Sequence, residues 1–216
     1  MIGISSLLSP ALAYFENVDT AAADASWTAY ENGTILSDPT VSIEDVTQAV
    51  IGWYMCPASV KEALAEYGFT LYLTTATDPD VVGSATGARY TYYVSSNLIA
   101  EITSEPYAIV STQASDIPAT VLHEIGHIFD KTIALFKSGV YEGSSFKISD
   151  SAQWQDLYAR YGETMLTLDS RCWRCTSAVE AFAEMFRMYC ESPRTLAEGC
   201  PEVYLYIQNV IVQYAG

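Results

Sequence analysis

The sequence predicts an α+β fold, with a small sheet in the first half of the chain and helices in the second. Short stretches rich in β-branched and aromatic residues gather between residues 69 and 112, whereas apolar residues recur at helical spacing from about residue 117. Strands followed by helices are typical of α+β proteins. A length of 216 residues suits one domain with a buried core. We therefore divide the chain into an N-terminal segment, residues 1–40, and a folded domain, residues 41–216.

The N-terminal segment leaves two interpretations open. Residues 1–14 are largely apolar and include an Ala-Leu-Ala tripeptide, but they lack a basic start and Pro10 interrupts them. A trimmed remnant of a signal peptide and an ordinary accessory helix both fit these residues.

Two helices and a set of short strands are expected next. The helices cover residues 43–55 and 57–67; Pro57 lies in the first turn of the second, and Gly68 ends it. A strand is expected over residues 69–75. Three further strands are expected over residues 88–96, 97–104 and 106–112. Because short polar turns separate these strands, we expect a small, mostly antiparallel sheet.

A helix with an unusual polar pattern follows the strands. Asp116 is a good N-cap and Pro118 suits the first turn. Apolar residues recur at positions 121, 125, 128 and 129, which lie on one side of a helix. Further helices are expected over residues 152–161, 178–190 and 202–214.

Composition excludes some classes of partner. The chain carries 26 Asp and Glu against 10 Lys and Arg, for a formal charge of −16. Nucleic acid as the main partner is excluded because phosphate binding needs a cationic face. No apolar run is long enough to span a membrane. The balance fits a soluble secreted protein, and it slightly favours a basic substrate.

The five cysteines give a mild indication of compartment. Cys190 and Cys200 bracket a short loop that a disulfide could close, and Cys172 and Cys175 form a lone CxxC pair. With Cys56 the count is odd, so the connectivity stays open. Disulfides are typical of secreted proteins, and we therefore expect a secreted or extracytoplasmic location.

The chemistry is concentrated in the segment VLHEIGHIFD, residues 121–130, which contains both histidines of the chain. His123 and His127 are one helical turn apart, so both imidazoles can bind one ion, with Glu124 beside them. This HExxH pattern is typical of zinc peptidases. Catalytic zinc takes three protein ligands and keeps one position open.

A carboxylate or thiolate must supply the third ligand, because no histidine remains. The best candidates are Glu180 and Glu184, one turn apart on the helix over residues 178–190. One would bind zinc and the other would accept a hydrogen bond from a ligand imidazole. Asp130 is a weaker alternative ligand. We expect it instead to support a ligand or to lie at the surface.

The two motifs together resemble a known family. VLHEIGHIFD, followed some fifty residues later by EAFAEMFR, resembles the catalytic domain of anthrax toxin lethal factor and the related secreted Pro-Pro endopeptidases. The likeness extends over roughly residues 40–216. It implies a zincin-like fold and one catalytic zinc ion. It also implies roles for five residues: His123, His127 and Glu180 as ligands, Glu124 as general base, and Glu184 as the carboxylate behind a ligand histidine.

The sequence therefore predicts a zinc-dependent endopeptidase of the HExxH…E type that acts on a protein or peptide substrate. One departure motivates an alternative: the family pattern has a tyrosine seven residues before the third ligand, and Trp173 stands there. Another tyrosine of the chain, such as Tyr161, is an alternative source of the phenol hydroxyl that the family pattern has at this position. A zincin-like module that binds zinc or a protein partner without catalysis is therefore the second prediction. The cleavage motif, oligomeric state and source stay open.

Overall fold

The computed structural model describes residues 28–75, 107–133 and 147–216. The strands expected over residues 88–96 and 97–104, and the N-terminal residues 1–14, lie outside these ranges. No helix in the described part of the chain is both long enough and apolar enough to cross a bilayer.

The described sheet has three strands, all parallel. It consists of β1 (Ile35–Ser37), β2 (Thr70–Thr74) and β3 (Tyr107–Ser111), in that spatial order. Leu71 and Leu73 of the central strand are fully buried, as is usual where elements cover both faces of a parallel sheet. The expectation of a mostly antiparallel sheet is therefore wrong for these strands.

The connection between β1 and β2 explains why these two strands are parallel. It contains two helices, α3 (Ile43–Met55) and α4 (Ala58–Glu66), and a crossover of this length returns the chain to the same end of the sheet. Sequence reasoning had no β1, because three residues are too few for a recognisable alternation. Gly68 has a φ of 69° and ends α4 as expected. The division at residue 40 stays a prediction, although β1 lies before it and pairs with β2.

The expected helix with the polar pattern is confirmed as α5 (Ile117–Ile128). The Asp116 carboxylate accepts a hydrogen bond from the Ala119 N–H at 3.0 Å, and Pro118 lies in the first turn. The four apolar positions expected on one side are fully buried: Val121, Ile125, Ile128 and Phe129. A π-helical turn, η2 (Phe129–Ile133), extends the helix.

The C-terminal half is helical, as expected. It contains η3 (Ile148–Asp150), α7 (Ala152–Met165), the 3₁₀ turn η4 (Cys172–Arg174), α8 (Ala178–Glu191), α9 (Pro193–Gly199) and α10 (Pro201–Ala215). The three helices predicted here are confirmed within a few residues. The sequence predicts a loop over the segment of α9, because seven residues are too few to show a helical period, although Pro193 at its start and Gly199 at its end are typical of a short helix.

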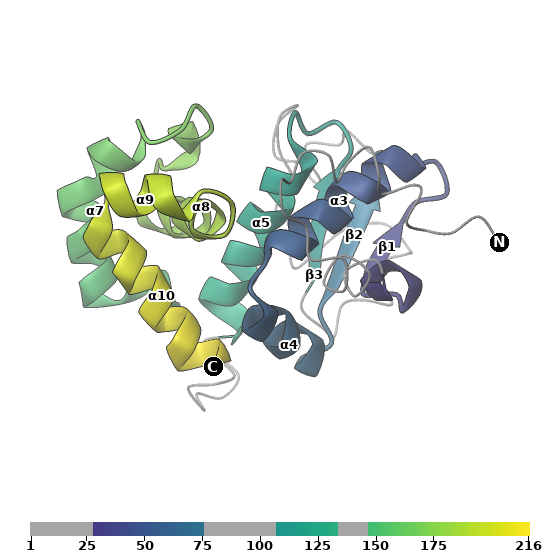
Figure 1. The fold of residues 1–216 in the computed structure, drawn as a ribbon, viewed down its shortest axis with the longest axis horizontal. Helices are drawn as coiled ribbons and strands as arrows, with labels where there is room; N and C mark the ends of the chain where they lie inside the picture. Colours follow the sequence, from purple (N-terminus) through teal and green to yellow (C-terminus); the bar gives the residue numbers. More distant parts are fainter. Residues whose placement is uncertain (1–27, 76–106, 134–146) are drawn as a thin grey trace.

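Helix α5 lies between the two halves of the molecule (Figure 1). It packs against α3 and β3 on one side and against α8 on the other. Helices α7, α9 and α10 surround α8 on the side away from the sheet (Figure 1). The interface between α5 and α8 is therefore where the two halves meet.

All five cysteines are free thiols in the structure. The suggested bridge between Cys190 and Cys200 is not formed. Cys172, Cys175 and Cys200 are buried in the helical half, and Cys56 is buried after α3.

Candidate metal centre

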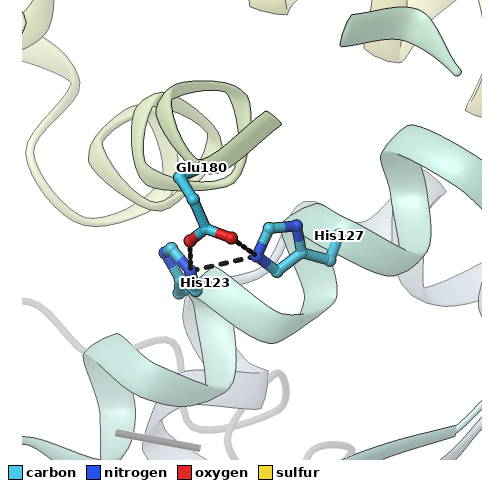
Figure 2. A group of neighbouring side chains, drawn as sticks. All are labelled: His123, His127 and Glu180. Atoms are coloured by element: carbon cyan, nitrogen blue, oxygen red, sulfur yellow. Dashed lines mark hydrogen bonds and ion pairs between the residues drawn. The ribbon is translucent and has the colours of Figure 1, made fainter. Parts of the chain in front are cut away.

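Three side chains from two helices converge at the interface between α5 and α8 (Figure 2). His123 and His127 project from successive turns of α5, and Glu180 projects from the first turn of α8. Ser177 begins α8 by accepting a hydrogen bond from the Glu180 N–H at 3.2 Å. This cap fixes the point at which the helix starts, and with it the position of the Glu180 side chain.

The distances among these side chains fit a shared metal ion. The two Nε2 atoms of His123 and His127 are 3.1 Å apart. Glu180 Oε2 is 3.2 Å from His123 Nε2, and Glu180 Oε1 is 3.5 Å from His127 Nε2. Ligands bound at 2.0–2.1 Å to a tetrahedral zinc ion would be separated by about 3.3 Å. The two imidazole nitrogens and the two oxygens of the Glu180 carboxylate therefore lie close to the spacing of ligands around one ion, and one atom from each residue can be chosen so that all three lie within 4.8 Å of one another.

Glu184 orients one of the histidines from behind. Its Oε2 lies 2.9 Å from His123 Nδ1, and Glu184 is completely buried. A carboxylate in this position accepts the Nδ1 hydrogen, so the lone pair of the imidazole is left on Nε2. His123 therefore directs Nε2 to the same point as His127 and Glu180.

The electrostatics of the cluster favour a cation. Burial alone would lower the pKa of His123, but its hydrogen bonds to Glu180 and Glu184 raise that pKa to about 9. Burial lowers the pKa of His127, with Glu180 opposing it. Hydrogen bonds from the two histidines outweigh burial and hold the pKa of Glu180 well below its ordinary value. Ionised carboxylates around two imidazoles thus create a negative field that a divalent ion can neutralise.

Glu124 completes the group on α5. It is 1% exposed, and it follows His123 directly and precedes His127 by three residues. Its charge is close enough to contribute to the raised pKa of His123. Glu124 therefore adds a buried carboxylate close to the two histidines.

The comparison with protein families agrees with this geometry. The model of the anthrax toxin lethal factor N- and C-terminal domain matches residues 79–210, more than half of the chain. The chain belongs to the lethal factor family. No curated protein matches it. The family description covers two domains, so membership alone does not assign catalysis to this chain.

The position at which the family pattern has a tyrosine is on the surface of this family member. Trp173 lies in η4 and is 54% exposed, with the Arg174 guanidinium 5.6 Å from its ring centroid. It lines a cavity of about 70 Å³ together with Glu184 and Arg187. The tryptophan therefore borders the side of the cluster on which Glu184 lies.

Tyr161, the alternative source of a hydroxyl, has a different partner. Its hydroxyl donates to Glu202 Oε1 on α10 at 2.7 Å. In this arrangement the hydroxyl is engaged between α7 and α10, outside the group of histidines and glutamates.

Asp130 has a structural role and is neither a ligand nor a surface residue. It is 1% exposed, and its carboxylate accepts hydrogen bonds from the Ser149 N–H and hydroxyl, both at 2.7 Å. These bonds tie the end of α5 to η3. Because Ser149 engages the Asp130 carboxylate in this way, Asp130 does not belong to the group of candidate metal ligands.

We expect Asp130→Asn to change the pH dependence of stability. Burial raises the pKa of Asp130 to about 6 from its ordinary 3.8, although the Ser149 hydrogen bonds oppose the rise. The folded state then holds this proton more tightly than the unfolded state. The stabilisation that this proton gives the folded protein is fully present below pH 3.8, and it is lost as pH rises through about 6. The loss amounts to about 3 kcal/mol.

The measurement is denaturant unfolding of the metal-free protein between pH 4 and about 7. Asp130→Asn should remove most of this loss, because the amide does not titrate. Asp156→Asn, which makes the same change at an exposed position of α7, should keep the wild-type profile. Identical profiles for wild type and Asp130→Asn would contradict the buried proton.

Arg187 is the residue near the cluster that sequence reasoning missed. It is buried on α8 and contacts Glu184. One signal was present in the sequence: Arg187 stands three residues after Glu184 and four before Glu191, the spacing of ion pairs along a helix. That spacing does not distinguish an exposed ion pair from a buried one.

Proposed function

We propose that this lethal factor family member is a zinc-dependent endopeptidase, which hydrolyses peptide bonds in a protein or peptide substrate. The observation that carries the proposal is the convergence of His123, His127 and Glu180, with Glu124 next to them. Two histidines and one glutamate form a donor set of catalytic zinc sites. Structural zinc sites are usually closed by four protein ligands, and this group in the described residues has three.

The chain's own residues supply proton transfer and orientation. Glu124 takes a proton from the attacking water and delivers it to the leaving amine. Glu184 holds the ring of His123 and fixes its tautomer. When bound, zinc supplies Lewis-acid polarisation of the water and of the scissile carbonyl.

The position of β3 supports an extended peptide as substrate. Among the described strands β3 lies at one edge of the sheet, and the chain passes from it into α5 within six residues. The edge of such a strand can hold an extended peptide by backbone hydrogen bonds once the edge is uncovered, because Ala108 to Ser111 of β3 are fully buried in this structure. The charge of −16 favours a basic sequence around the cleaved bond.

Cleavage of a diverse peptide pool, read by mass spectrometry, tests the proposal. The purified protein is compared before chelation, after chelation and after zinc is restored. Cuts that disappear on chelation and return with zinc support a metallopeptidase and reveal its motif. Cuts that persist without metal would exclude this mechanism.

The second candidate is a module that binds zinc or a protein partner without catalysis. Trp173 favours it, because an indole N–H differs in reach and acidity from the phenol of the family pattern. This module would bind zinc and cut no peptide at any protein concentration. Trp173→Tyr is then the variant that asks whether the missing phenol is the cause.

Zinc is expected to stabilise the protein under either candidate function. Because the site requires α5 and α8 to be packed together, zinc binds the folded chain and raises its free energy of unfolding. A thousandfold excess over the dissociation constant adds about 4 kcal/mol, or roughly 10 °C in Tm for a chain of this size. Thermal unfolding with zinc and with chelator measures the shift. An unchanged Tm would indicate that the histidines are core residues without a metal.

A further inference from the structure

Arg187 lies one turn after Glu184 on α8 and is 1% exposed. Its Nε donates to Glu184 Oε1 at 2.9 Å, and its Nη2 reaches the same oxygen at 2.7 Å. The other oxygen, Glu184 Oε2, accepts from His123 Nδ1. One oxygen of this buried carboxylate is therefore committed to the arginine and the other to the histidine. The carboxylate cannot rotate without breaking one of these interactions.

Arg187 is itself held from the far side. Its Nη1 pairs with Glu191 Oε2, and its Nη2 lies 3.7 Å from Cys172 Sγ and 3.8 Å from Asp169 Oδ2. A planar guanidinium engaged on several edges has little rotational freedom. Arg187 is thus a fixed support for Glu184.

The same network reaches the helix that carries both histidines. Arg171 contacts Glu191 at 2.9 Å and Asp169 at 2.7 Å, and it also contacts Asp116 Oδ2 at 2.6 Å. The other oxygen of Asp116 caps α5. Ion pairs therefore connect the support behind Glu184 to the N-terminus of α5. Both helices of the metal centre are held by one set of charges.

We propose that Arg187 is a positioning residue for the metal centre. Its guanidinium fixes the Glu184 carboxylate, which in turn holds His123 with Nε2 directed at the metal. The inference rests on the proposed zinc site but not on peptide cleavage. Partners behind a ligand histidine typically change metal affinity by about 10–100-fold, and an arginine that acts through such a partner should have an effect in that range.

Arg187→Lys is the informative variant. Lysine keeps the positive charge that the buried carboxylates need, but its single nitrogen cannot reproduce the planar contacts to Glu184 and Glu191. Zinc affinity is measured by competition with a chromogenic chelator. Cobalt(II) serves as a second probe, because its visible spectrum reports the geometry of the ligands. We expect zinc affinity to fall about 10–100-fold and the cobalt spectrum to change.

A double-mutant cycle separates positioning from general destabilisation. Glu184→Gln alone should weaken zinc binding to a similar extent. Adding Arg187→Lys to it should cost little more, because Arg187 acts through Glu184. Arg194→Lys, the same change at an arginine that is 89% exposed, is the matched control and should bind zinc as wild type does.

The outcomes are distinct. Wild-type affinity and spectrum in Arg187→Lys, or fully additive losses in the cycle, would overturn the positioning role. Failure of the wild-type protein to bind zinc would overturn the proposed site and this inference with it. Zinc binding without peptide cleavage would overturn the proposed endopeptidase while the cycle still decides the role of Arg187.

If Arg187→Lys does not fold, Glu191→Gln takes its place. This substitution removes the charge that pairs with Arg187 on the side away from Glu184, and it leaves both Arg187 and Glu184 in the chain. A severalfold loss of zinc affinity supports the inference, and unchanged affinity overturns it.

Discussion

Replacing Glu124 with glutamine should reduce peptide cleavage by roughly 10²–10⁴-fold while zinc stays bound. Glutamine has almost the same shape as glutamate but cannot accept a proton at neutral pH. Glu124 is not one of the three converging side chains proposed to hold zinc, so its replacement should leave zinc affinity close to that of wild type. The measurement pairs kcat/KM on the best peptide from the pool with zinc content.

A matched substitution elsewhere isolates this effect. Glu163→Gln makes the same change at an exposed position of α7 and should cleave at the wild-type rate. Cleavage by Glu124→Gln as fast as by wild type would mean that another group takes the proton of the water. A loss of zinc together with activity would assign Glu124 a part in holding the metal.

The local parts of the site could be predicted from the sequence. His123 and His127 are one turn apart in any helix, and so are Glu180 and Glu184, so helical periodicity alone gives two paired sets of side chains. The N-cap Asp116 and the buried apolar stripe of α5 follow from equally local rules. These predictions are confirmed because each depends on residues within a few positions of one another.

The parts that depend on distant residues could not be predicted in this way. The spacing between Glu180 and the histidines is set by the packing of α8 on α5, which periodicity does not describe. The direction of the strands depends on pairings between residues far apart in the chain, such as Thr70 with Tyr107, and β1 has too few residues to carry a pattern. The charges of the network that joins Arg187 and Arg171 are separated by up to 75 residues, from Asp116 to Glu191, and a sequence shows such charges as unrelated surface residues.

Gly126 is expected to set the distance between the two helices of the site. A Cβ atom at this position would lie 2.8 Å from Cα and 2.9 Å from the carbonyl oxygen of Ala183. These atoms belong to the backbone of α8, so no side chain can turn aside to make room. Gly126→Ala must therefore push α8 away from α5. Glu180 would then move away from His123 and His127.

Two effects of Gly126→Ala oppose each other in stability. Alanine favours the helix by about 1 kcal/mol relative to glycine, whereas overpacking in a closed interface costs about 1–3 kcal/mol. We expect net destabilisation of about 1 kcal/mol or more, because the contact is with backbone. The larger effect falls on zinc, since ligand distances must hold to within about 0.2 Å. We expect a loss of affinity greater than tenfold, measured by chelator competition alongside denaturant unfolding.

Gly162→Ala provides the comparison within the same protein. Gly162 lies inside α7, and the atoms nearest to a Cβ there belong to the ring of Tyr158, at 3.4 Å and beyond, an ordinary contact distance. The helix propensity of alanine should dominate at that position, so stability should be unchanged or higher and zinc affinity unaffected. If Gly126→Ala behaved in the same way, the close approach of α5 and α8 would not be what holds Glu180 against the two histidines. A loss of zinc affinity confined to Gly126→Ala would instead show that Gly126 acts through the distance between α5 and α8. Glycine has no side chain that could bind the metal, so no direct effect on zinc is available to it.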